Sequence, residues 1–202
     1  MVAPKYILIL LLTLFTAPIL HAQDVSNDNA EYYQDSLLKG GYIISYRTDD
    51  STEYLLLRKN GKAITELSLI SKGLLAKNLG YVWADFQNCF VFVNAYGPCN
   101  PIEARLINKK DGKNIFKTTV ALLDVDKIKG LILYTDDAAS LDNIKLILYN
   151  IHSGKREIFN CPKDLDASEV YCSVQITKLT DKQLTIKYQG ETSGKTKTYK
   201  RH

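Results

Sequence analysis

The sequence is poor in the residue types that most often carry catalysis: its 202 residues include 3 histidines, 1 tryptophan and 1 methionine. Beyond the N-terminal 22 residues only His152, in an expected turn, and the terminal His202 remain. There is no G-x-S-x-G nucleophile elbow, no H-E-x-x-H metal motif and no glycine-rich phosphate loop. We therefore expect no catalytic residue, no metal site and no cofactor.

Long hydrophobic runs are absent after residue 22, so we expect no membrane span in that part of the chain. At the N-terminus, Lys5 precedes the nearly continuous apolar run 6–15, and Leu20-His21-Ala22 approximates a cleavage site. This order is typical of a secretory signal peptide, residues 1–22, cleaved before Gln23. A retained anchor is the alternative, although Pro18 interrupts the apolar segment. The sequence thus predicts a periplasmic or secreted protein that is not an integral membrane protein after cleavage.

The sequence also lacks a large excess of charge of one sign. Lys and Arg number 26 and Asp and Glu 22, which leaves a formal net charge of +4. So small an excess does not indicate a nucleic-acid partner, because phosphate backbones are bound by dense basic surfaces.

The sequence contains 4 cysteines. An even number in an exported chain favours disulfides, because the compartment is oxidising. We expect the pairs Cys89–Cys99 and Cys161–Cys172, since each encloses a short segment with turn-forming residues. Spacings of ten and eleven residues fit neither a C-x-x-C redox motif nor the close pairs of a zinc site.

From residue 40 onward the pattern favours β-structure, with β-branched and aromatic runs separated by Gly, Asn, Asp and Lys turns. Residues 23–39 form a polar leader and 40–202 a single β domain. Residues 72–78 are the one segment expected to form a helical turn. The expected strands are 42–47, 53–59, 63–69, 80–86, 89–95, 103–108, 114–119, 130–135, 143–150, 155–159, 170–178, 183–189 and 195–200.

Three similar turns recur along the chain: Asn60-Gly61, Asp111-Gly112 and Ser153-Gly154, each between two lysines or a histidine and a lysine. Asn-Gly and Asp-Gly favour tight hairpins because they tolerate positive φ. An irregular repeat of this kind is typical of propeller blades. The predicted fold is all-β, built of antiparallel hairpin repeats in about four propeller-like blades, with a β-sandwich as the alternative.

The sequence offers few catalytic candidates besides its acids. The densest acidic spots are Asp49-Asp50, Asp124-x-Asp126 and Asp136-Asp137. Two carboxylates that face one cleft are enough for glycoside hydrolysis, so a carboxylate-dependent hydrolase is an alternative function. We expect these acids instead to form turns, as aspartates at strand ends commonly do.

The strongest indication of binding is aromatic. Tyr81, Trp83 and Asp85 alternate along one expected strand, and Tyr96 follows within the expected Cys89–Cys99 loop. Aromatic rings beside a carboxylate can bind a sugar or an apolar side chain of a protein. The alternative is that Tyr81 and Trp83 belong to the core.

Together these features predict an exported, disulfide-containing β-module without catalysis that binds a protein partner or a glycan in a bacterial-type envelope. The alternatives are the hydrolase, a structural subunit, and an inhibitor or immunity-type protein. The sequence predicts neither the ligand nor the oligomeric state.

Overall fold

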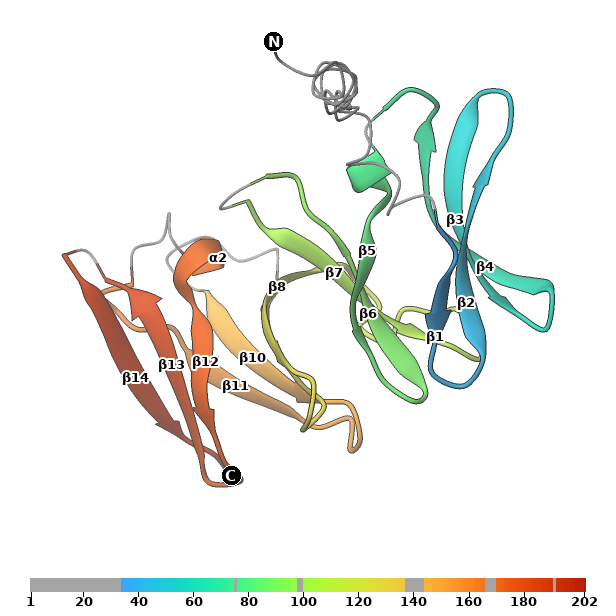
Figure 1. Ribbon diagram of the computed structural model, residues 1–202. Coiled ribbons are helices and arrows are strands. Elements are labelled where there is room, and N and C mark those ends of the chain that lie inside the picture. The colour runs from blue at the N-terminus through green and yellow to red at the C-terminus, as the bar shows by residue number, and fades with distance from the viewer. Residues whose placement is uncertain (1–33, 75, 98–99, 137–143, 166–169, 191) are drawn as a thin grey trace, which may run out of the picture.

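The computed structural model describes residues 34–74, 76–97, 100–136, 144–165, 170–190 and 192–202. Their 14 strands form three antiparallel sheets, each with its strands in chain order (Figure 1). The first sheet contains β1 (Ser36–Leu38), β2 (Tyr42–Thr48), β3 (Thr52–Lys59) and β4 (Lys62–Ser71). The third contains β12 (Gln175–Leu179), β13 (Gln183–Gln189) and β14 (Gly194–Lys200).

The second sheet is the largest, with seven strands. Two short helical segments flank it: the 3-10 helix η2 (Ala76–Leu79) precedes it, and α2 (Val170–Ser173) follows it. Its strands are β5 (Tyr81–Asp85), β6 (Cys89–Asn94), β7 (Ile102–Asn108), β8 (Val120–Asp126), β9 (Leu131–Thr135), β10 (Lys145–Asn150) and β11 (Arg156–Asn160).

The predicted all-β, antiparallel class is confirmed. Four blades of similar size are not seen, because the described strands divide into sheets of four, seven and three, and none of these sheets closes on itself. Two of the three expected hairpin turns are confirmed: Asn60 (φ 49°) and Gly61 (φ 77°) join β3 to β4, and Gly154 (φ 69°) lies between β10 and β11. The expected turn at Asp111-Gly112 does not join two strands, because a loop with one bridge follows it. The last strand, β14, lies at an edge of the third sheet.

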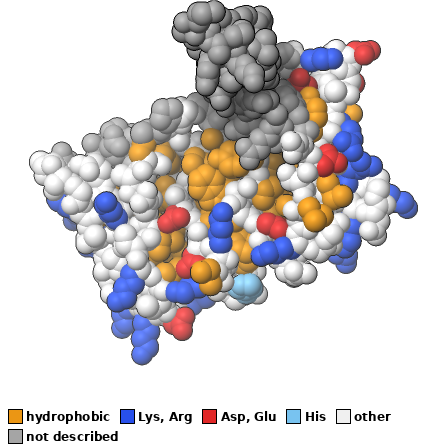
Figure 2. Space-filling model, viewed as in Figure 1, with side chains coloured by type: hydrophobic (Ala, Val, Ile, Leu, Met, Phe, Trp, Pro, Cys, Tyr) orange, Lys and Arg blue, Asp and Glu red, His pale blue; other side chains and the backbone are white. Residues whose placement is uncertain are grey.

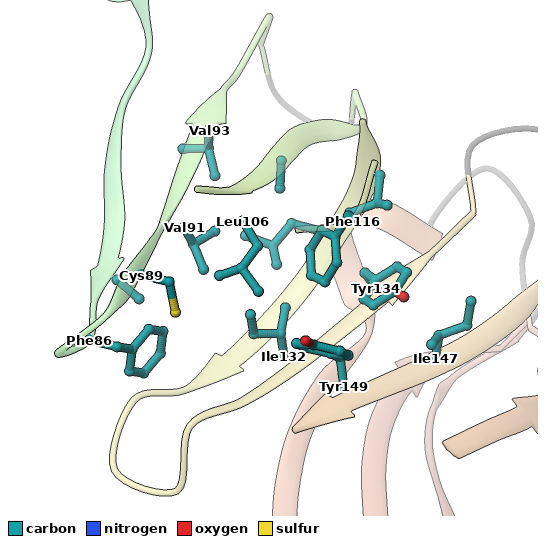
Figure 3. Close-up of a cluster of buried hydrophobic side chains, with 14 residues drawn as sticks. Phe86, Cys89, Val91, Val93, Leu106, Phe116, Ile132, Tyr134, Ile147 and Tyr149 are labelled. Carbon is teal, nitrogen blue, oxygen red and sulfur yellow. The ribbon is translucent and has the colours of Figure 1, made fainter. Parts of the chain in front are cut away.

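One face of the seven-stranded sheet forms a core of its own. Figure 3 shows side chains from β6, β7, β9 and β10 converging on this face around Phe116, which comes from the loop before β8. The Phe116 ring lies 4.8 Å from that of Tyr134 and 5.3 Å from that of Tyr149. We call this set the inner cluster; its buried members are Ala84, Phe86, Cys89, Val91, Val93, Ala104, Leu106, Phe116, Val120, Leu122, Ile132, Tyr134, Ile147 and Tyr149.

Two separate regions of the opposite face are covered by other parts of the protein. Near its first strands it packs against the first sheet, and near β9 and β10 it packs against α2 and the third sheet. Strands β6 and β9 are consequently buried on both faces, as their two-sided apolar sequences predict. The first contact buries Leu38, Ile44, Leu55, Leu57, Leu67, Leu79, Phe90, Phe92 and Ile107. The second buries Leu131, Leu133, Ile144, Leu146, Leu148, Val170, Val174, Leu179, Leu184, Ile186 and Tyr188.

Several expected elements differ from the structure. β1 lies in the segment expected to be a polar leader, because Leu38 is buried while its neighbour Leu37 remains 78% exposed. The expected strand 114–119 is a loop with one bridge, from Asn114 to Ile107, and the strand β8 follows it. The expected strand 170–178 begins as helix α2.

The two expected disulfide pairs are not formed, although Cys172 itself is disulfide-bonded. Cys89 is a buried free thiol of the inner cluster, and Cys161 is a half-buried free thiol at the end of β11. Neither Cys89–Cys99 nor Cys161–Cys172 is therefore present, and Cys99 lies outside the described residues. Sequence spacing predicted these pairs without the side-chain directions that a disulfide requires. Burial raises the pKa of each free thiol to about 11, so both are protonated at neutral pH.

The C-terminal end of the described chain is attached to β11. Arg201 forms an ion pair with Glu157 in which its Nε and Nη2 donate to Oε1 at 3.1 and 2.7 Å. The same side chain donates through Nη1 to the Thr180 carbonyl at 2.7 Å. The last residues therefore join the second sheet to the turn between β12 and β13.

The predicted signal peptide, residues 1–22, lies outside the described residues. Within the described part of the chain, no helix combines the length and the apolar character needed for a membrane crossing. Figure 2 shows Lys and Arg side chains scattered over one face with hydrophobic side chains between them, rather than gathered in one basic field.

Candidate functional site

The expected aromatic patch centres on β5, one of the two edge strands of the seven-stranded sheet. The pairing of β5 with β6 shifts between Val82 and Ala84, which makes Trp83 the extra residue of a β-bulge. A bulge breaks strict alternation, so Trp83 packs partly against the inner cluster while Tyr81 stays 37% exposed. The two rings still lie together, with centroids 6.1 Å apart.

The Asp85 carboxylate is held by other groups of the protein and is not free to bind a ligand. Its Oδ1 lies 2.6 Å from the Lys109 ammonium, and its Oδ2 accepts the Lys39 backbone N–H at 2.7 Å. Both carboxylate oxygens therefore have cationic or N–H neighbours from the protein. Asp85 joins the end of β5 to the turn after β1 and does not lie free beside the two aromatic rings.

The sequence does not indicate a structural role for Lys109, because a lysine in a Lys-Lys-Asp-Gly turn is normally exposed. Its side chain is only 1% exposed, and its ammonium donates to the carbonyls of Lys39 at 2.8 Å and Phe86 at 2.6 Å. Together with Asp85 these partners occupy the ammonium fully. No signal in the local sequence distinguishes Lys109 from the exposed Lys110 beside it.

Tyr96 lies apart from the other three residues. Its side chain is 56% exposed in the loop after β6, and its hydroxyl is 3.5 Å from Glu103 Oε2. Burial and the Glu103 carboxylate raise the pKa of the Tyr96 hydroxyl. The structure thus brings Tyr81 and Trp83 together, assigns Asp85 to an ion pair, and leaves Tyr96 outside the group.

A cleft of about 410 Å³ lies beside Tyr81, between the first sheet and β5. Its apolar lining comes from Ile44, Leu55 and Val82, of which the first two are only 5% exposed. The remaining lining residues are the polar Gln34 and Ser36 with Gly80 and Tyr81. The described residues of the cleft therefore combine apolar side chains with neutral polar groups, and none of them carries a carboxylate or an ammonium.

Two edge strands border this cleft. β1 is the first strand of its sheet, and β5 is the last strand in the order of the second sheet. Gln34 and Ser36 lie opposite Gly80 to Val82 across the cleft, while Lys39 bonds to Asp85 at the far ends of the two strands. β1 and β5 therefore run in the same direction, joined at one end and separated by the cleft at the other.

Gly80 gives the cleft its shape at the start of β5. Its φ of 86° is rarely adopted by residues with a side chain, and a Cβ there would lie 2.5 Å from the Val93 carbonyl oxygen. A larger residue would push β5 away from β6. Residue 80 is expected inside the strand 80–86, and the local residue pattern does not reveal this requirement.

The clustered carboxylates form turns and structural contacts. Asp49 accepts the N–H groups of Ser51 and Thr52, which lower the pKa of its carboxyl. Asp124 accepts the Ile176 N–H at 2.8 Å and so joins β8 to β12, while Asp126 accepts two amides in the turn that follows. Asp137 lies outside the described residues.

Metal-ligating residues do not gather anywhere in the described segments: no group of three or more His, Cys, Asp or Glu side chains is found there. No protein-family model, curated protein or solved structure matches the chain. The function therefore has to be argued from the cleft and its surroundings.

Proposed function

We propose that the mature protein is an exported, non-catalytic β-module whose cleft between β1 and β5 binds an extended segment of a partner protein. The proposal rests on the two edge strands that flank the cleft. An edge strand presents backbone N–H and C=O groups that an added strand can pair with. An extended peptide placed between β1 and β5 would gain such bonds on both sides.

The side chains of the cleft indicate which segment would fit. Ile44, Leu55 and Val82 offer an apolar surface, and the exposed Tyr81 ring stands at the rim. Because successive side chains of a strand point to opposite faces, a bound peptide would place alternate residues toward this surface. The preferred partner segment therefore carries apolar residues at every second position and no charge on the inward face.

Export is part of the proposal and has its own measurement. Expression of the full chain with a C-terminal tag, followed by fractionation and N-terminal sequencing, is expected to give an exported product that begins at Gln23. A product that retains Met1 in the cytoplasm would contradict the exported location without affecting the cleft.

A carboxylate-dependent hydrolase is less well supported. A general acid needs a raised pKa, whereas every described carboxylate with a shifted pKa, namely Asp49, Glu157 and Asp164, is shifted downward. A structural subunit, or an inhibitor or immunity-type protein, would also use a protein-binding surface. The mass of the purified protein in solution, alone and with its partner, separates these roles.

Selection from a library of random extended peptides provides the test. The mature protein is expected to enrich peptides with alternating apolar residues. Ser36→Arg, which places a long charged side chain at an exposed cleft position, should weaken binding by about tenfold or more, because it blocks one edge. Ser71→Arg, at an exposed position on the first sheet away from the cleft, is the matched control.

Two results would overturn the assignment: no enrichment of any peptide class, or equal binding by the wild type and a folded Ser36→Arg variant. Trp83→Ala adds a second measurement, because Trp83 supports the Tyr81 ring without lining the cleft. Weaker peptide binding in a folded Trp83→Ala variant would show that the aromatic pair takes part in recognition.

A further inference from the structure

A second pocket, of about 380 Å³, lies at the other end of the junction between the first sheet and β5. It forms where the turn after β1, the end of β3, the turn between β5 and β6 and the end of β7 meet. Its lining is polar and differs completely from that of the cleft. The lining residues are Gly40, Tyr42, Lys59, Gln87, Asn88, Asn108, Lys109 and Lys110.

The pocket is rich in hydrogen-bond donors. Among the described residues, neither Lys59 nor Lys110 has a carboxylate within ion-pair distance. The side-chain amides of Gln87 and Asn88 have no hydrogen-bond partner in the described part of the protein, and Asn108 uses only its oxygen, which accepts the Lys110 N–H at 2.8 Å. Two ammonium groups and three primary amides are therefore available around one space.

No carboxylate is among the described residues that line the pocket, and Asp85, which contacts the lining residue Lys109, is already neutralised. Asp85 contacts the buried Lys109 ammonium at 2.6 Å, so the pair adds no net charge. Asp111 does not line the pocket, and its carboxylate accepts the Lys113 N–H at 3.1 Å. The charge that remains at the pocket is that of Lys59 and Lys110.

Lys59 is also held in place. Its ammonium lies 4.2 Å from the centre of the Tyr42 ring, within the range of a cation–π interaction. The ring limits the freedom of a side chain that would otherwise lose entropy on binding. An ammonium positioned in advance binds an anion with a smaller entropic cost than a free surface lysine.

We propose that this pocket binds an oxyanion: a phosphate, sulfate or carboxylate group carried by a small molecule such as an acidic sugar. An oxyanion accepts hydrogen bonds at several oxygens, which matches a pocket that offers ammonium and amide donors and no free carboxylate. The site is separate from the cleft between β1 and β5 and does not depend on the proposed peptide binding.

Proton–nitrogen NMR of the mature protein tests the proposal with four probes: inorganic phosphate, inorganic sulfate, glucuronate and, as the neutral comparison, glucose. The charged probes are expected to give saturable shifts of the side-chain amides of Gln87, Asn88 and Asn108, and glucose to give none. Binding should weaken as ionic strength rises, because salt screens the two lysines. The relative affinities of the three charged probes then separate phosphate, sulfate and carboxylate.

The double variant Lys59→Gln/Lys110→Gln should weaken binding by about tenfold or more, because each lysine supplies a charged hydrogen bond. The matched control, Lys127→Gln/Lys182→Gln, removes two exposed lysines outside the pocket and should leave binding unchanged. Asn88→Asp, at an exposed position, is a second variant that repels the anion without removing a lysine. Absence of saturable shifts, equal shifts with glucose, or equal loss in both double variants would overturn the proposal.

Discussion

At the scale of single residues, the buried polar groups are the most informative. The Tyr134 ring is fully buried in the inner cluster, yet its hydroxyl has no hydrogen-bond partner among the described residues. Burial raises the pKa of this hydroxyl, so it stays protonated at all moderate pH values. An unpaired buried hydroxyl destabilises a fold, because its hydrogen bonds with water are lost without replacement.

Tyr134→Phe should therefore stabilise the protein. The ring contact with Phe116 and the packing within the inner cluster remain, while the unpaired hydroxyl is removed. We expect the free energy of unfolding to rise by about 1 kcal/mol, measured by denaturant titration. Tyr54→Phe, on the half-exposed part of β3, is the control and should change little. A clear loss of stability in Tyr134→Phe would show that the hydroxyl is bound in solution.

At the scale of elements, Lys109 and Asp85 join the first sheet to the second. Lys109 donates to the carbonyls of Lys39 and Phe86, and Asp85 accepts the Lys39 N–H. These bonds bring the end of β1 against the end of β5. The cleft and the donor-rich pocket lie on either side of this connection, so both depend on it.

Removal of the Lys109 ammonium should be costly. Lys109→Met leaves Asp85 without its cation and two carbonyls without their donor, and we expect a loss of about 3 kcal/mol in unfolding free energy. Lys110→Met, at the exposed neighbouring position, should change stability by about 0.5 kcal/mol or less. Equal effects of the two substitutions in thermal or denaturant unfolding would contradict the structural role of Lys109.

Local sequence predicted the hairpins well, because their information lies in the turn residues. Asn60-Gly61 adopts positive φ at both positions, as a two-residue hairpin requires. The prediction of a strand over 114–119 was wrong for a local reason that the spacing of apolar residues does not reveal. Asn114 Oδ1 accepts the N–H groups of Leu106 and Phe116, and Lys117 has a φ of 68°, so the segment folds as a loop.

The cleft could not be predicted in this way. Ser36 and Val82 meet only because two sheets pack together, and no periodicity in either segment indicates that contact. The aromatic alternation of Tyr81 and Trp83 lies on β5, a strand that lines the cleft. The β-bulge that interrupts this alternation at Trp83 depends on how β5 pairs with β6. The residues of β5 alone do not specify that pairing.

At the scale of the whole molecule, the ends of the second and third sheets are joined by Glu157 and Arg201. Burial opposes ionisation of Glu157, but the hydrogen bonds and charge of Arg201 outweigh it and lower the pKa of the carboxyl. A lowered folded-state pKa stabilises the fold above the unfolded pKa, and this contribution is lost as pH falls. The ion pair therefore makes the native state sensitive to acid.

Glu157→Gln should lower the free energy of unfolding by about 2 kcal/mol at neutral pH, because it removes a charged hydrogen bond. The difference from the wild type should shrink once the pH falls below about 4.3, the value of an unfolded glutamate. Asp181→Asn, an exposed acid without an ion pair in the described residues, is the control. A difference that stays constant from neutral to acid pH would contradict the proposed ion pair.

The order of the strands has a consequence for how the chain acquires its structure. Each described sheet is built from successive strands, so every hairpin can close as soon as both of its strands are free to pair. Short loops make such closures fast, because little chain entropy is lost at each step. Each described sheet can thus form one hairpin at a time, in the order of its strands along the chain. Arg201 follows the last strand, so its bond back to Glu157 can form only after β14 is in place.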